Sequence, residues 1–251
     1  MKIVVLGIKS KTTWILSNII NKKYNINKIF IINKQSYLQF LKKKILKNNI
    51  FSTFGQILFF FYYKILLNLS FKKVSLLLGK LNINHNFPEP ETEFFQGTDK
   101  QIISKLKLEN PDIVIINGTR VLSLEILTSV NAIFINLHCG ITPKYKGVHG
   151  GYWANKNNDI KNTGVTIHKV TKTLDDGPIF FQKIIKYKKY DNISTFPFKQ
   201  YIIGAKLLMK VIEDLSNNKK VNYLHNNLKS KIYFHPTIYQ YLICLFLYKK
   251  K

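Results

Sequence analysis

The sequence is poor in cysteine, glycine and proline, and each shortage excludes a class of protein. Its 251 residues include two cysteines, Cys139 and Cys244, too few for the disulfide framework of a small secreted protein. We expect both to be free thiols in a reducing compartment. Only 12 glycines and 7 prolines occur, which excludes collagen and a long disordered tail. A chain of this length can bury a sizeable core, so we expect one large domain with a small appendage.

Acidic residues are scarce as well. The 13 Asp and Glu face 39 Lys and Arg, which gives a formal net charge of +26. Such an excess is typical of proteins that bind nucleic acid or an anionic surface. However, Arg120 is the single arginine, and Lys, Asn and Ile are residues that A/T-rich codons encode. We attribute most of the charge to codon composition, and keep a basic nucleic-acid-binding or membrane-surface protein on the same fold as the alternative.

Long apolar runs are few, and the start of the chain lacks the pattern of a secretory signal. The most lipid-like stretch is residues 51–71, but its uninterrupted apolar run covers only Ile57 to Tyr63 before Lys64. That run is too short to cross a bilayer. We therefore expect no transmembrane segment and a buried or amphipathic helix here. An interfacial helix held by neighbouring lysines is the alternative.

Short apolar runs alternate with helix-like segments along the chain. Strands are expected at residues 2–6, 29–32, 113–116, 132–135, 164–170 and 178–187, and helices at 12–20, 98–108, 123–128, 151–156 and 194–215. We expect residues 34–80 to be mostly helical and 82–93 to form an extended loop. The alternation predicts an α/β fold, a Rossmann-like open and mainly parallel sheet with flanking helices. We place a catalytic domain at residues 1–190 and a helical, basic C-terminal appendage at 191–251.

Polar side chains follow the apolar run at 132–135. Asn136 and His138 are two residues apart at the carboxyl end of a strand, so both face the same side, where ligands bind in open α/β sheets. Asp175 lies in a turn between two β-runs, from which it could reach a histidine. No nucleophile elbow or metal-ligand spacing accompanies them, so we expect direct transfer without a metal. Asn136 and a protonated His138 would stabilise an oxyanion, while Asp175 keeps the imidazole charged.

Three motifs around these residues resemble the signature of the folate-dependent formyltransferases. They are Asn136-x-His138 followed by Pro143, Tyr145 and Gly147; Thr163-Gly-Val-Thr-x-His168; and Leu174-Asp-Asp-Gly-Pro followed by Gln182. The resemblance is dense from about residue 112 to 182. It implies the formyltransferase fold, N10-formyltetrahydrofolate as donor, and Asn136, His138 and Asp175 as catalytic residues. It also implies that loops 118–122 and 171–174 hold the pterin, with contacts from Gly118, Arg120, Leu122 and Leu174.

The resemblance also limits which acceptor of the formyl group we expect. The family includes glycinamide ribonucleotide transformylase, whose phosphate loop is rich in glycine, whereas only Gly7 precedes the first helix here. Methionyl-tRNA formyltransferases carry a C-terminal barrel that roughly 60 residues after Asp191 would not supply. We therefore expect a cytoplasmic enzyme that formylates a nucleotide-linked amino sugar for lipopolysaccharide or glycan biosynthesis. A methionyl-tRNA formyltransferase-like enzyme is the runner-up.

Several residues are candidates for contacts with the acceptor. Lys9 and Ser10 lie near a helix start, where phosphate binds readily. His149 and Trp153 either border the acceptor pocket or pack a helix onto the sheet. We expect His168 to support the site through hydrogen bonds, and Cys139 to be a packed thiol. A homodimer is compatible with the sequence, and nucleic acid is not an expected partner.

Overall fold

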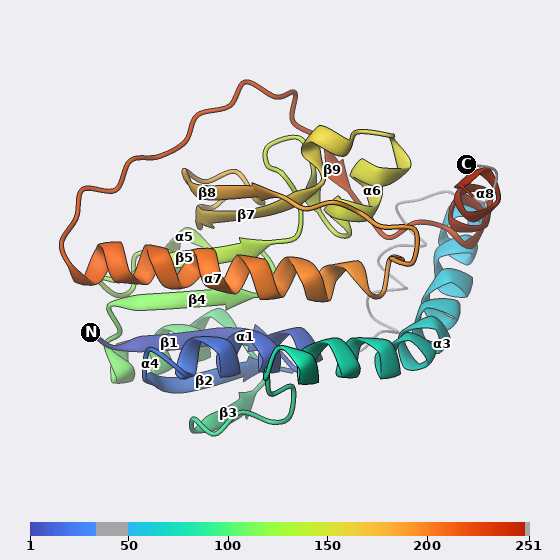
Figure 1. Cartoon of the computed structure of the whole chain (residues 1–251). Helices are drawn as coiled ribbons and strands as arrows, with labels where there is room; N and C mark the ends of the chain where they lie inside the picture. The colour runs from blue at the N-terminus through green and yellow to red at the C-terminus, as the bar shows by residue number, and fades with distance from the viewer. Residues whose placement is uncertain (34–49, 249–251) are drawn as a thin grey trace.

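A computed structural model describes residues 1–33 and 50–248 of the chain (Figure 1). The strands are β1 (Ile3–Ile8), β2 (Ile26–Ile32), β3 (Thr92–Phe95), β4 (Ile113–Asn117), β5 (Ile133–His138), β6 (Lys146–Gly147), β7 (Gly164–Lys169), β8 (Ile179–Ile184) and β9 (Ile232–Tyr233). The helices are α1 (Lys11–Asn21), α3 (Ile50–Lys80), α4 (Asp99–Glu109), α5 (Leu124–Leu127), α6 (Gly150–Lys156), α7 (Phe196–Ser216) and α8 (Ile238–Tyr248). A 3-10 turn spans Ile160–Asn162.

The main sheet has seven strands in the order β3-β2-β1-β4-β5-β7-β8. The five strands from β3 to β5 pair in parallel, and β7 and β8 extend the sheet as antiparallel strands. The predicted Rossmann-like, mainly parallel sheet is thereby confirmed. Because the parallel strands share one direction, β1, β4 and β5 end at one edge of the sheet, where sites form in such folds.

Alternating side chains of the strands fill two apolar layers. In β1, Ile3 and Val5 pack with residues of α1 and α7, whereas Val4 and Leu6 pack with residues of α4 and α5. The period of two along a strand therefore divides its apolar side chains between the two faces. In Figure 1, α1 and α7 cover the face of the sheet nearer the viewer.

Side-chain caps fix where the helices begin. The Ser10 hydroxyl accepts a hydrogen bond from the backbone N–H of Thr13 at the start of α1, 3.2 Å away. Thr98 and Gln101 form a capping box that opens α4. Pro197 lies in the first turn of α7, where a missing N–H costs no hydrogen bond.

Two features differ from the sequence-based expectations. The expected loop 82–93 runs into β3, a short edge strand that pairs with β2. Of the expected helical stretch 34–80, residues 34–49 lie outside the described part of the chain. The remainder is one continuous helix, α3, and not a buried one: by length and composition, Phe51–Lys80 could cross a membrane, and only 17% of its most apolar window is buried. The uninterrupted apolar run alone underestimated the length of this apolar helix, because the helix continues past Lys64.

The chain after α7 leaves the layers of the sheet. It runs around the molecule past β8 and returns to pair β9 with β6 in parallel, before α8 packs beside α3 (Figure 1). The expected domain boundary at 190 precedes α7, which packs on β7 and α1. The division of the chain at that boundary remains a prediction.

Candidate active site

The carboxyl end of β5 presents two polar side chains. Asn136 and His138 lie two residues apart in the strand, and Asp175 approaches both from the loop between β7 and β8. The Asn136 side-chain amide donates to Asp175 Oδ1 at 3.3 Å. His138 Nδ1 lies 3.3 Å from Asp175 Oδ2. The structure thus brings together the three residues that the sequence analysis selected from separate stretches.

The Asp175 carboxylate is held by further contacts. The backbone N–H of Gly147 donates to Asp175 Oδ2 at 2.8 Å. His168 Nε2 lies 3.6 Å from Asp175 Oδ1 and 3.2 Å from the Asn136 amide nitrogen. His168 therefore touches the two other polar groups as a support, and its Nδ1 faces the Lys169 carbonyl at 2.9 Å.

Asp175 is ionised at neutral pH despite its burial. Burial alone would raise the pKa of this carboxyl, but the opposing effects of His138, His168 and the Gly147 N–H lower it to about 2. The residue also has a backbone φ of 46°. A carboxylate fixed in this way is a permanent negative charge beside the two imidazoles.

Burial and the charge of Asp175 act in opposite directions on the pKa of His138. Burial lowers the pKa of His138, and the attraction of Asp175 and the Tyr145 carbonyl compensates only in part. His138 Nε2 lies 2.7 Å from the Tyr145 carbonyl oxygen and its Nδ1 faces Asp175 Oδ2, so each ring nitrogen faces an acceptor for an N–H. A proton on Nδ1 would therefore be stabilised directly by the Asp175 carboxylate.

These residues line a cavity of about 510 Å³. Its walls include the expected cofactor loops, with Gly118, Arg120, Leu122 and Leu174 all among the lining residues. Apolar side chains from Ile8, Ile116 and Val170 face the same space. A cavity of this size, mostly apolar with a few convergent polar groups, is typical of a small-molecule site.

Arg120 is tied to its own surroundings. Its guanidinium pairs with Asp99 at the first residue of α4 and donates to the Gly97 carbonyl at 3.3 Å. Beside it, Gly118 has a backbone φ of 70°, which glycine adopts readily. The side chain of Arg120 therefore shapes the loop, and the main chain of residues 118–122 borders the cavity.

Of the four residues expected to contact the acceptor, the structure places one at the cavity. His149 lines the cavity, but Lys9, Ser10 and Trp153 are not among the described residues that line it. Ser10 caps α1, and the Lys9 ammonium lies over the ring of Phe94 at 5.9 Å. Trp153 is buried and donates from Nε1 to the Phe234 carbonyl at 3.0 Å, so it packs α6 against the C-terminal segment.

Sequence reasoning missed residues that reach the cavity from distant segments. Tyr63 of α3, Tyr201 of α7 and His235 after β9 all line it. Burial raises the pKa of Tyr63 to about 12, so its hydroxyl stays protonated. His235 Nδ1 lies 3.0 Å from His149 Nε2. No local motif marks these residues, because only the tertiary fold brings them to β5.

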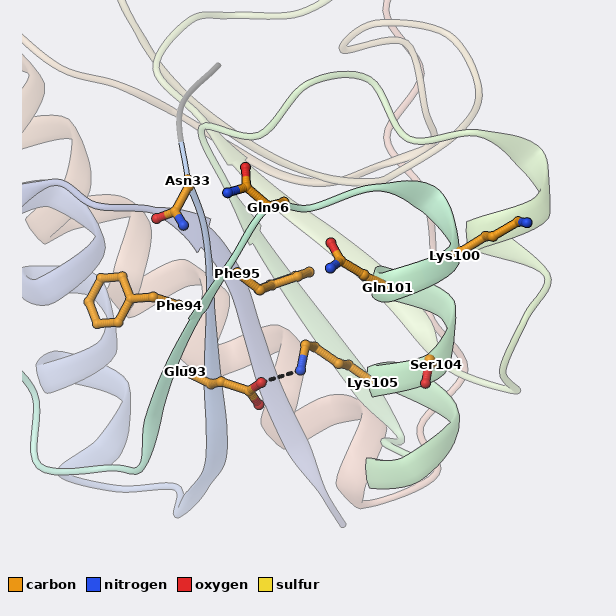
Figure 2. A pocket seen from close by; sticks show the side chains of 9 residues that line it. All are labelled: Asn33, Glu93, Phe94, Phe95, Gln96, Lys100, Gln101, Ser104 and Lys105. Carbon is orange, nitrogen blue, oxygen red and sulfur yellow. Dashed lines mark hydrogen bonds and ion pairs between the residues drawn. The ribbon is translucent and has the colours of Figure 1, made fainter. Parts of the chain in front are cut away.

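A second hollow of about 600 Å³ lies beside β3 and α4, and Figure 2 shows its lining side chains. Of its three charged lining residues, Glu93 and Lys105 form an ion pair with each other. Asn33 at its rim is the last described residue before position 50. Within residues 1–33 and 50–248, no cluster of three or more His, Cys, Asp and Glu side chains is placed to hold a metal ion.

A family model and curated relatives both indicate the same family. A family model described as "Formyl transferase" matches residues 1–212. A methionyl-tRNA formyltransferase from Thermodesulfovibrio yellowstonii is 37% identical over 118 residues, which are 47% of this chain and 38% of that protein. Another from Lactobacillus gasseri is 29% identical over 156 residues, 62% of this chain and 48% of that protein. The matches thus span less than half the length of these curated relatives.

Solved structures share the fold at lower identity. A 4-N formyltransferase from Francisella tularensis aligns with a TM-score of 0.55 and 17% identity, covering 92% of this chain and 76% of that one. A phosphoribosylglycinamide formyltransferase from Anaplasma phagocytophilum aligns with a TM-score of 0.58 and 15% identity, covering 93% and 97%. At such identities these likenesses bear on the fold alone.

Proposed function

Because this chain belongs to the formyl transferase family, we propose that it transfers the formyl group of N10-formyltetrahydrofolate to a primary amine. The observation that carries the proposal is the meeting of Asn136, His138 and Asp175 at the wall of one cavity, with contacts of 3.3 Å. Direct transfer needs no covalent enzyme intermediate. It needs a donor to the carbonyl oxygen and a place for the proton of the attacking amine.

The cavity suits the folate. Its lining combines apolar side chains, which suit a flat heteroaromatic ring, with the main chain of residues 118–122 and 171–174. Gly118, Arg120, Leu122 and Leu174 would hold the pterin there. When bound, the cofactor supplies the activated formyl group, and the protein supplies orientation, charge stabilisation and proton transfer.

Each catalytic side chain has a distinct task in this proposal. The Asn136 amide donates to the formyl oxygen as negative charge develops on it. His138 Nδ1, facing ionised Asp175, accepts the proton that the amine loses and returns a proton to the nitrogen that leaves the formyl carbon. His168 positions Asn136 and Asp175 by contacting both.

A nucleotide-linked amino sugar is the acceptor that we propose. Solved structures of similar fold include a sugar N-formyltransferase from Shewanella and the 4-N formyltransferase described above. Tyr233 and His235 of the C-terminal segment line the cavity, whose volume of about 510 Å³ favours a small acceptor. The same site in a cytoplasmic enzyme would serve lipopolysaccharide or glycan biosynthesis.

A methionyl-tRNA acceptor is the second candidate, favoured by the names of the curated relatives. The two are separated by incubating the protein and formyl-folate with a panel of amino-sugar nucleotides and with charged initiator tRNA. We expect an amino-sugar nucleotide to gain the mass of one CO group in a mass spectrum. Formylation of the tRNA alone would overturn the sugar proposal, and formylation of neither class of acceptor would count against the whole assignment.

A further inference from the structure

Helix α3 carries an apolar stripe on its solvent side. The exposed residues of the stripe are Phe54, Leu58, Phe61, Ile65 and Leu69. Their spacing of three and four residues places them on one face of the helix. Their side chains range from 37% exposed at Leu58 to 74% at Leu69. A face with this pattern is normally buried, so the exposed stripe indicates an interaction surface.

Helix α8 extends the stripe sideways. Tyr241 and Cys244 are buried, and the ring of Tyr241 lies 5.4 Å from that of Tyr62 on α3. Leu242 and Ile243 of α8 are exposed. In Figure 1, α8 lies beside the N-terminal half of α3 at the right-hand edge of the molecule. We call the exposed apolar residues of these two helices the α3–α8 surface.

The segments that supply this surface carry charged side chains of one sign. All 13 Asp and Glu lie between Glu89 and Asp214, so residues 1–88 and 215–251, which supply α3 and α8, contain lysines and no carboxylates. Lys64, Lys72 and Lys73 belong to α3 itself. Codon bias does not explain this separation, because the codons of Asp and Glu can be A/T-rich as well. The carboxylates are confined to the part of the chain that contains the catalytic residues.

We propose that the α3–α8 surface binds an anionic lipid bilayer and lies in the plane of its interface. Apolar side chains such as Phe61 enter the boundary between headgroups and acyl chains, and lysines such as Lys64 and Lys72 face the anionic headgroups. Both contributions act in the same direction, since apolar burial and attraction to anionic lipid together hold interfacial helices. The absence of carboxylates from these segments removes the repulsion that would oppose such binding.

We expect α3 to lie parallel to the bilayer surface, because the side of the helix opposite the stripe packs against the rest of the protein. Val74 and Leu78 of α3 pack in a cluster with Ile15 of α1 and Phe198 of α7. Farther toward its N-terminus, Phe59 packs in a cluster with residues of α6 and α8. Crossing the bilayer would expose these contacts along the whole helix, although α3 is long enough to span. Binding by the exposed stripe alone preserves them.

Two other occupants fit the surface less well. A second copy of the chain, paired by a two-fold axis, would place identical lysine-rich and carboxylate-free segments against each other. Nucleic acid would satisfy the lysines, but the exposed aliphatic residues Leu58, Ile65 and Leu69 do not suit a phosphate backbone. An anionic bilayer satisfies both the charge and the apolar stripe.

The test is sedimentation of the full chain with lipid vesicles, measured without folate or acceptor. One vesicle type is phosphatidylcholine with about one third phosphatidylglycerol, and the neutral type is phosphatidylcholine alone. We expect the protein to bind the anionic vesicles, with weaker binding at high salt. Phe61→Glu should lower the partition coefficient at least ~tenfold, and the uncharged Phe61→Asn should lower it too. Leu108→Glu, at a leucine on α4 that is even more exposed than Phe61, is the control and should bind as wild type does.

Each result bears on the proposal directly. Absence of vesicle binding, or equal loss in Phe61→Glu and Leu108→Glu, would overturn it. A dimer that Phe61→Glu disrupts, or RNA binding, without any vesicle binding would assign the surface to those partners instead. Binding that resists extraction by alkaline carbonate would indicate a spanning helix and would also contradict the in-plane arrangement. Asn136→Ala should bind vesicles normally, so failure of the proposed chemistry would not affect this result.

Discussion

At the residue scale, one carboxylate contacts each of the other polar groups of the proposed active site. Asp175 contacts His138, His168 and the Asn136 amide, and its pKa of about 2 keeps it charged at any physiological pH. Because three partners converge on this one group, the geometry of each depends on the others. Changes at these positions should therefore affect the rate far more than they affect the fold.

Asn136→Ala should lower kcat by ~10²–10³, because it removes a hydrogen bond to the oxygen on which negative charge develops. Steady-state rates with formyl-folate and an identified amine acceptor measure this effect. Asn136→Asp keeps the size of the side chain but loses the N–H donors, so we expect a loss at least as large. Unchanged circular dichroism would show that both variants fold. A rate close to that of wild type in Asn136→Ala would remove this residue from the mechanism.

His149 makes folding sensitive to acid. Burial and the neighbouring His235 lower the pKa of His149 from 6.5 to about 3, so the unfolded chain takes up a proton at a higher pH than the folded one does. The free energy of unfolding therefore decreases as the pH falls below about 6.5, by up to about 1.4 kcal/mol per pH unit from this group.

His149→Asn should make this decrease shallower. Asparagine is chosen because His149 has a backbone φ of 59°, which asparagine tolerates well. Urea unfolding of both proteins between about pH 5 and about pH 8 provides the comparison. The two curves should run parallel above about pH 7.5, where the histidine is neutral in both states. If they also remain parallel in acid, the lowered pKa of His149 is contradicted.

At the scale of single elements, local patterns were more informative than long-range ones. The period of two in β5 placed Asn136 and His138 on one side, and the helix expected at 98–108 matches α4 to within one residue at each end. The edge strand β3 was missed because it has only four residues and follows Pro88 and Pro90. The exposure of α3 could not be predicted either, since an apolar sequence does not indicate which of its faces the rest of the chain covers.

Thr98→Ala should lower the free energy of unfolding by about 1 kcal/mol, because Thr98 accepts from the Gln101 N–H in the capping box of α4. Thr98→Ser keeps the hydroxyl and should stay within a few tenths of a kcal/mol of wild type. Chemical unfolding of wild type and the two variants measures the three free energies of unfolding. Equal stability of the Ala and Ser variants would mean that the cap contributes nothing.

At the scale of the whole molecule, segments far apart in sequence complete the site. β9 pairs with β6, whose Gly147 N–H holds Asp175, so the C-terminal segment is linked to the catalytic carboxylate through one strand pair. Motif spacing selected the proposed catalytic residues within 112–182, but no sequence motif indicated that Tyr63 and residues 232–235 would line the same cavity. Such contacts depend on how the chain returns after α7, which no local periodicity encodes.

The same return of the chain predicts where acceptor specificity resides. Tyr233 lines the cavity and stacks on Tyr145, with ring centroids 5.1 Å apart. Tyr233→Ala should raise KM for the acceptor about tenfold or more while changing KM for formyl-folate little, because Tyr233 belongs to β9, whereas the proposed folate loops, 118–122 and 171–174, follow β4 and β7. The control is Tyr223→Ala, which removes a tyrosine from the same segment that packs on Phe180 and is not among the lining residues. Equal increases in KM for both substrates in Tyr233→Ala would mean that this ring supports the fold of the site, and that acceptor recognition lies elsewhere in the cavity.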